Sequence, residues 1–234
     1  LEKYKKPAFI DSLVANIATF ERLQSVERVN LSDLYGDFID FIIVRNKGIV
    51  LAHFGRYSER SRMLLSRNLV NSAHVTLPDL QLLLSDKQFV VRKTVLMHFE
   101  KLTDNEVRRL LKDRSSTIRY RTLWRLRGTP AFPGLAVDFV ADDSAEIRDL
   151  VMRIVIEAGK DLSAMYASNL QRREKITGSL GGIAELGEKR LVPSVEPFLN
   201  HASFRVRKGA FLALRKLYQD KAVDDDTANL GTRD

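Results

Sequence analysis

Four stretches of the chain align on a hydrophobic residue followed by arginine, and this internal repeat restricts the fold more than any other feature. Apolar residues mostly follow each arginine at about three, four and seven positions, the spacing of one helix face. With two weaker copies included, the arginines are 30, 27, 29, 24 and 35 residues apart. A period of about 30 residues is typical of a two-helix repeat unit. The aligned residues are Arg62, Arg92, Arg119, Arg148, Arg172 and Arg207.

A shorter apolar segment precedes each anchored helix and is expected to form the first helix of the unit. The segments span residues 78–85, 104–113, 132–141, 161–169 and 191–200. Alternating runs joined by hairpin turns, which would predict strands, do not occur in the sequence.

Helix start and stop signals agree with this division. Proline is expected at helix starts and glycine just past helix ends, and a Ser, Thr or Asp three residues before Glu predicts a capping box. The residues concerned are Pro78 and Pro133, the pairs Thr103–Glu106 and Asp143–Glu146, and Gly128, Gly159 and Gly187.

The pattern resembles HEAT repeats, and most of all the short bacterial type named after phycobilisome lyases, over residues 58–219. In that family an Asp in the turn and an Arg early in the second helix form a ladder along the stack. Three aspartates here lie six residues before an anchor arginine, whereas the Arg62 and Arg172 copies lack one and the last copy carries His201. The resemblance implies a structural ladder of Asp86, Arg92, Asp113, Arg119, Asp142, Arg148 and Arg207.

This ladder would explain why Arg119 lies on the apolar face of its predicted helix, beside Ile118 and Leu123. Burying an unpaired arginine is costly. The planar guanidinium, with its five donors, is suited to bridging turn carboxylates and carbonyls of its own and adjacent repeats. We therefore expect the anchor arginines to be structural.

The expected fold is all-α: a right-handed α-solenoid, or superhelix, of about six HEAT-like helix pairs whose second helices line the concave side. Residues 1–57 lack the repeat, contain amphipathic segments at 9–23, 31–44 and 48–55, and are predicted to be N-terminal capping helices. Residues 58–219 would form the repeats, and residues 220–234 a polar C-terminal tail.

No motif for catalysis or metal binding stands out. The four histidines are widely spaced, the chain has no cysteine, and no nucleophile has a recognisable base. The glycine-rich stretch at 177–182 lacks the spacing of a phosphate loop, so its glycines are interpreted as sites of close helix packing; the alternative is that they admit a ligand backbone. The sequence predicts no enzyme and no cofactor.

Basic residues gather between Lys87 and Arg127, a segment that carries as much net positive charge as the whole chain, +8. The residues expected to bind a macromolecule are Lys93, Arg108, Arg109, Arg121, Trp124, Arg125 and Arg127. A basic zone suits an acidic partner surface. The other interpretation is a solvated face, with Trp124 packed against the next repeat.

The function expected is that of a non-catalytic scaffold or adaptor that binds another protein, one with an acidic surface. The alternative is nucleic-acid binding, for which the alkylpurine DNA glycosylases, also built of HEAT-like repeats, are a precedent; their aromatic and carboxylate constellation does not map onto this chain. No bilin-specific residues support a lyase-like activity. The longest apolar stretch, 38–44, is too short to span a bilayer, so no membrane insertion and a cytoplasmic location are expected. Because residue 1 is Leu, we expect an excised or processed segment.

Overall fold

The computed structural model describes residues 7–26 and 32–219, and the predicted tail at 220–234 lies outside them. The described residues are predominantly helical and contain no strand. The all-α solenoid predicted from the repeat is confirmed at this level.

Within the described residues up to Ala52, the chain forms α-helices and a π-helical turn. They are α1 (Pro7–Val26), α2 (Ser32–Ile39), η2 (Asp40–Arg45) and α3 (Lys47–Ala52). The segment predicted to be amphipathic at 9–23 lies in α1, where Ile10, Val14 and Ile17 are fully buried. Asn46 separates η2 from α3, and its side-chain amide donates a hydrogen bond of 2.8 Å to the carbonyl of Phe41.

A polar cluster ties α1 to the short 3₁₀ turn η3 (Phe54–Arg56). The carboxylate of Asp11 accepts a 2.7 Å hydrogen bond from the Tyr57 hydroxyl and lies 3.0 Å from Nδ1 of His53. The Tyr57 bond lowers the pKa of Asp11, whereas burial, followed by the bond to Asp11, raises the pKa of Tyr57. No signal in the sequence predicts this contact, since its members are more than 40 residues apart.

Pairs of a short and a long helix make up the rest of the chain. The first helices are α5 (Leu77–Leu84), α7 (Asp104–Leu111), α9 (Phe132–Val137), α11 (Leu162–Asn169) and α13 (Val192–Val195), the last with 3₁₀ turns η5 (Lys189–Leu191) and η6 (Glu196–Asn200). The second helices are α4 (Glu59–Asn71), α6 (Phe89–Thr94, continued by the 3₁₀ segment η4, Val95–Lys101), α8 (Ser116–Leu126), α10 (Ala145–Glu157), α12 (Ile176–Leu186) and α14 (Phe204–Gln219).

The helix ends follow the sequence signals in part. The capping box of Thr103 and Glu106 forms at the start of α7. The predicted box of Asp143 and Glu146 is wrong: Ser144 is the N-cap of α10, and its side chain makes no cap bond. Its backbone N–H is instead held by Asp142, one residue earlier than predicted.

The glycines after three second helices behave differently from one another. Gly159 and Gly187 have φ of +70° and +71°, the left-handed conformation of a helix C-cap. Gly128 does not adopt a positive φ, so the C-cap predicted there is wrong. It lies in the turns that connect α8 to α9.

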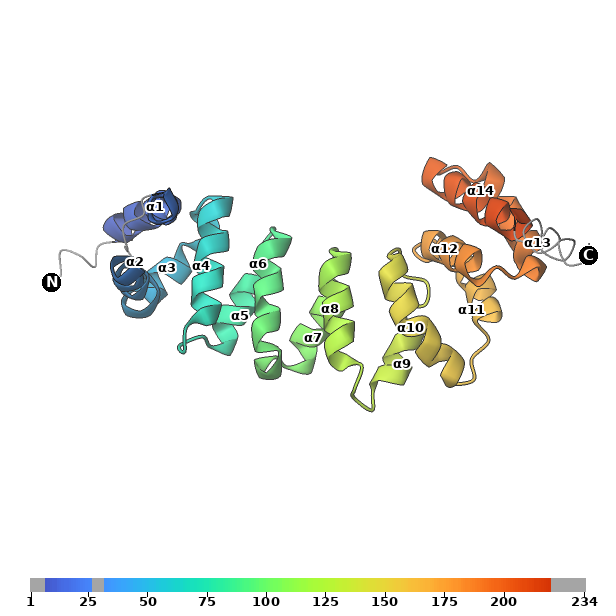
Figure 1. The fold of residues 1–234 in the computed structure, drawn as a ribbon, viewed down its shortest axis with the longest axis horizontal. Coiled ribbons are helices and arrows are strands. Elements are labelled where there is room, and N and C mark those ends of the chain that lie inside the picture. The colour runs from blue at the N-terminus through green and yellow to red at the C-terminus, as the bar shows by residue number, and fades with distance from the viewer. Residues whose placement is uncertain (1–6, 27–31, 220–234) are drawn as a thin grey trace, which may run out of the picture. The chain divides into compact units, whose positions relative to one another are not determined.

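The chain divides into two compact units, Leu1–Ile118 and Arg119–Asp234, with the boundary inside α8. In the first unit α6 packs against both α4 and α5, and Figure 1 shows α4 and α6 side by side. In the second unit α12 packs against α10, α11 and α14. This division reflects compactness, whereas the predicted segments 1–57 and 58–219 were defined by the presence of the repeat. The predicted segments therefore stay a prediction.

Candidate partner-binding groove

Buried ion pairs between successive helix pairs set the positions of the second helices. Arg92, 5% exposed, donates from Nε and Nη2 to the carboxylate of Asp113 over 2.6 and 2.8 Å. Its Nη1 donates over 2.9 Å to the carbonyls of Asp86 and Lys87, in the turn of its own unit. One side chain therefore joins its own turn to the next.

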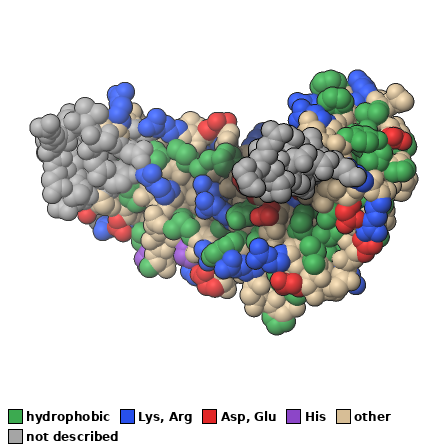
Figure 2. Space-filling model, turned by 45° about the vertical axis from the view of Figure 1, so that its right-hand side comes forward, with side chains coloured by type: hydrophobic (Ala, Val, Ile, Leu, Met, Phe, Trp, Pro, Cys, Tyr) green, Lys and Arg blue, Asp and Glu red, His purple; other side chains and the backbone are tan. Residues whose placement is uncertain are grey.

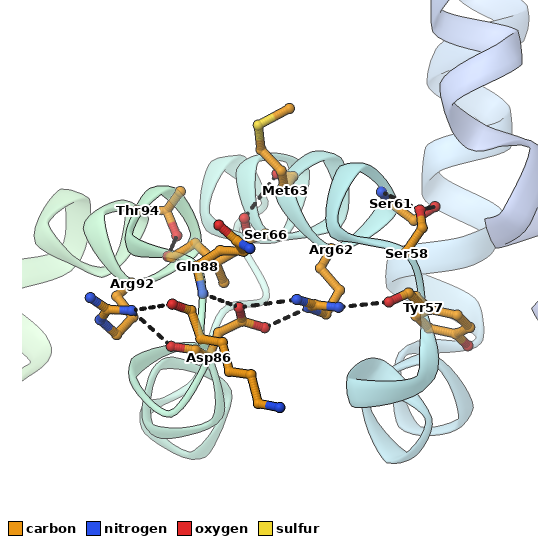
Figure 3. A network of polar contacts seen from close by, with 12 residues as sticks. Tyr57, Ser58, Ser61, Arg62, Met63, Ser66, Asp86, Gln88, Arg92 and Thr94 are labelled. Atoms are coloured by element: carbon orange, nitrogen blue, oxygen red, sulfur yellow. Dashed lines mark hydrogen bonds and ion pairs between the residues drawn. The ribbon is translucent and has the colours of Figure 1, made fainter.

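The same arrangement recurs at two further arginines. Arg62 donates from Nε to Asp86 over 2.7 Å and from Nη1 to the Tyr57 carbonyl (Figure 3). In the second compact unit of the chain, Arg119 donates to both oxygens of Asp142 over 2.7 and 2.9 Å. We call these bonds the ladder.

Each ladder aspartate also shapes its turn, because one carboxylate oxygen accepts from the backbone N–H two residues later. The donors to Asp86, Asp113 and Asp142 are Gln88, Ser115 and Ser144.

The charges of a ladder pair stabilise each other. The hydrogen bond to Asp113 raises the pKa of Arg92. Burial alone would raise the pKa of Asp113, but the bonds from Arg92 and from the Ser115 backbone outweigh it, so the net pKa is lowered.

The fifth unit departs from the ladder, and its sequence alignment on Arg172 is wrong. Arg172 is exposed in the connection between α11 and α12. The equivalent position is Ser179, whose backbone N–H donates to the carbonyl of Lys175 as that of Arg92 donates to Gln88. Ser179 is fully buried, and its hydroxyl has no hydrogen-bond partner among the described residues.

Arg148 therefore pairs with a helix rather than with a turn. Its Nε donates over 2.8 Å to Glu185 on α12, a second bond runs from Nη2 to the same carboxylate, and Nη1 donates to the carbonyl of Asp142 over 2.7 Å. Burial lowers the pKa of Arg148, but the hydrogen bond and the charge of Glu185 together raise it by more, so the net shift of the pKa is upward.

The glycines of α12 allow this close approach. A Cβ on Gly178 would overlap the carbonyl of Ala141, and one on Gly182 would overlap the ring of Tyr166. One on Gly181 would press on the guanidinium of Arg148. These contacts support the interpretation that the glycine-rich stretch serves helix packing.

The last unit keeps half of a ladder contact. Nη1 of Arg207 donates to the carbonyls of His201 and Ala202 over 2.8 and 2.9 Å. His201 replaces the turn aspartate, with its Nδ1 accepting the backbone N–H of Ser203 over 3.0 Å.

The basic residues predicted to bind a partner fall in both units. On α8 and just after it, Arg121, Arg125 and Arg127 are exposed. Trp124 remains 46% exposed, with the guanidinium of Arg127 4.7 Å above its ring, so the next repeat does not bury it.

A groove of about 790 Å³ opens beside this stacked pair, between the end of α8 and α10. It is lined by Arg127, Gly128, Phe132, Asp149, Leu150, Met152, Arg153, Ile154, Ile156 and Glu157. Ile156 is 54% exposed, so the groove offers apolar surface to a partner. Sequence reasoning missed Arg153 and Ile156, although they follow Arg148 at the same distances as Trp124 and Arg127 follow Arg119.

The remaining predicted residues belong to the first unit and are not joined to this groove. Arg108 and Arg109 are exposed on α7, and Arg109 donates to the hydroxyl of Ser85 over 3.2 Å. Lys93 on α6 is partly buried.

Among the described residues, no group of three or more His, Asp or Glu side chains could hold a metal ion. Within the same ranges, every helix is too short or too polar to cross a membrane.

The comparisons with known proteins assign the chain to no family. No family model matches the chain, and no curated protein matches it. A designed armadillo repeat protein, YIII(Dq)4CqI, is 16% identical, with 72% of this chain and 98% of that chain covered and a TM-score of 0.30. A designed armadillo repeat protein in complex with the peptide (KR)4 is 17% identical, with 89% and 99% covered and a TM-score of 0.27. At such values the assignment as a helical-repeat solenoid rests on the chain's own helix pairs.

Proposed function

We propose that the protein is a non-catalytic repeat scaffold that holds a partner protein in the α8–α10 groove. The observation that carries the proposal is the exposed Trp124–Arg127 stack beside a groove with exposed apolar lining. Exposed aromatic and arginine side chains beside a pocket are the residue types that dominate protein interfaces.

The buried ion pairs support this use of the surface, because they account for the buried arginines and leave those of the groove available. Arg119 and Arg148 hold the helices, whereas Arg127 and Arg153 are exposed. The binding residues thus project from a scaffold positioned by ion pairs.

The partner chemistry that fits is an apolar segment flanked by carboxylates. Arg127 and Arg153 would attract the carboxylates, while Met152 and Ile156 would pack against the apolar side chains. Asp149 and Glu157 also line the groove and would repel a uniformly acidic ligand, which favours a mixed segment over a polyanion such as nucleic acid.

Trp124 is the only tryptophan of the chain, so its fluorescence reports on the groove. Two short peptides with the same apolar residues, one carrying Glu and the other Lys, would be titrated against the protein, and labelled copies followed by anisotropy. We expect the Glu peptide to bind and to shift Trp124 emission. Replacing Arg127 and Arg153 together with Glu should remove the preference, whereas replacing Lys160 and Lys189, exposed elsewhere in the second unit, should leave it.

A labelled thymidine oligonucleotide tests the alternative. Phosphate neutralisation would make its affinity fall with salt by a slope of about −0.7 per phosphate contacted. Sub-micromolar oligonucleotide binding that persists at physiological salt would favour nucleic-acid binding instead, if replacing Arg121, Arg125 and Arg127 with Ala abolishes it.

A further inference from the structure

The outer face of α14 carries aromatic and basic side chains in alternation. Phe204, Phe211 and Tyr218 are 70%, 59% and 63% exposed, and the exposed Lys208 and Arg215 lie between them. These five residues follow the spacing of one helix face and are called the α14 stripe.

The other side of α14 is committed to the fold. Val206, Ala210, Ala213 and Leu217 are buried, and α14 packs against α12, α13 and η6. The helix contains no Asp or Glu. Figure 2 shows green hydrophobic and blue basic side chains side by side at the upper right, the end that carries α14.

A repeat whose outer face is left uncovered normally presents polar side chains there. The α14 stripe is aromatic instead, and within the described part of the chain it stays open, as its exposed fractions show. An exposed row of rings on the last described helix indicates a surface that another element covers.

The spacing of the stripe favours a helix as that element. The rings recur every seven residues, with the basic side chains in the same period, as the two seam positions of a heptad do. The absence of acidic residues from α14 means that carboxylates on the partner would meet Lys208 and Arg215 without competition along this helix.

Other occupants fit less well. A second copy of α14 would bring like charges together. Successive rings are about 10 Å apart along the axis, far more than the ~3.4 Å between stacked bases, so they do not form a continuous stacking platform for a single strand. Insertion into a membrane would need a continuous apolar face, whereas the exposed rings of the α14 stripe are interrupted by Lys208 and Arg215.

We propose that the α14 stripe docks an acidic amphipathic helix of a partner protein, which adds to the stack as a further helix would. This second binding surface is independent of the α8–α10 groove.

Two synthetic amphipathic peptides test the proposal with the full chain. They share their apolar heptad positions and differ only in carrying Glu or Lys beside them. We expect the Glu peptide to bind and to gain helicity in circular dichroism, and the Lys peptide to bind much more weakly. Replacing Phe211 and Tyr218 together with Ala should weaken binding by about tenfold or more.

A charge exchange supplies the sharper test. Lys208→Glu with Arg215→Glu should transfer the preference to the Lys peptide, a result that a merely sticky surface would not give. Lys160→Glu with Lys189→Glu is the matched control, because both side chains are exposed in the same unit outside α14. Trp124→Ala should leave this binding unchanged, so failure here is distinguishable from failure of the groove.

Several results would overturn the proposal. They are a Glu preference that survives the charge exchange, binding without gain of helicity, or a thymidine oligonucleotide or phosphatidylserine vesicle that binds better through the same residues. Peptide binding seen only in a chain ending at Gln219 would assign the stripe to residues 220–234, and concentration-dependent dimerisation lost with Phe211→Ala would assign it to a second copy.

Discussion

Replacing Arg92 with Met should strand a buried carboxylate while filling much of the same space. Asp113 would lose both bonds from Arg92 and keep the one from the Ser115 backbone, with a side chain only 8% exposed. The carbonyls of Asp86 and Lys87 would lose their donor as well.

The expected cost is about 3–5 kcal/mol, the range for breaking a buried ion pair from one side. That is a large part of a typical stability of about 5–15 kcal/mol. Urea denaturation followed by circular dichroism should show it as a midpoint lowered by about 1–5 M, for a typical urea m value of about 1–3 kcal/mol/M. Adding Asp113→Asn should restore part of the loss, since the stranded charge is then gone.

The dependence on pH supplies an internal control. The folded-state pKa of Asp113 is lowered, so the pair's contribution is present above the unfolded value of about 4 and is lost as the pH falls through the folded value. In Arg92→Met the stranded carboxyl gains stability when protonated, and the deficit should narrow towards about pH 3. The reasoning would be refuted if the loss of unfolding free energy in Arg92→Met were equal at neutral pH and at about pH 3. It would also be refuted if that loss were as small as the loss in the exposed Arg121→Ala.

Arg119→Ala should cost about 1–3 kcal/mol and Arg121→Ala, exposed on the same helix, less than about 0.5 kcal/mol in urea denaturation; equal effects would contradict the ladder. Tyr166→Phe removes a hydroxyl without a described partner, so it should add about 1 kcal/mol at neutral pH. Burial, then the charge of Glu185, raises the pKa of Tyr166 to about 12, above its ordinary value of 10.0. As the pH rises above 10.0 the unfolded chain loses the tyrosine proton first, so the folded protein loses stability relative to the variant. Tyr166→Phe should therefore resist alkaline unfolding better, and identical alkaline midpoints would refute this. Gly178→Ala should lower the melting temperature, because its Cβ overlaps backbone; an unchanged melting curve would exclude the close contact.

The helix pairs and the charge partners of the ladder were accessible from sequence because their chemistry repeats. An arginine on an apolar face needs an acceptor, and an aspartate six residues before it marks the turn. The partner of each arginine is nevertheless the aspartate of the following unit, which spacing within one repeat does not distinguish.

The fifth helix pair is misaligned in the sequence because no arginine stands at the equivalent position, and one stands seven residues before it. Arg172 offers an arginine where the structure has a loop, while Ser179 has no side chain that marks an anchor. Glu185 could not be foreseen, since its approach to Arg148 depends on the glycines of α12. The groove likewise needs two helices brought together, although the register of Arg153 and Ile156 was readable.

The ladder also bears on how such a chain can change length. An arginine of this kind needs only an aspartate in the turn between the two helices of whichever pair follows, so one helix pair can be duplicated or deleted by recombination while the joint that results stays complete. The joint at Arg148 differs, because its acceptor lies within α12. The fourth and fifth units are therefore expected to be inherited together, and insertions to accumulate before them.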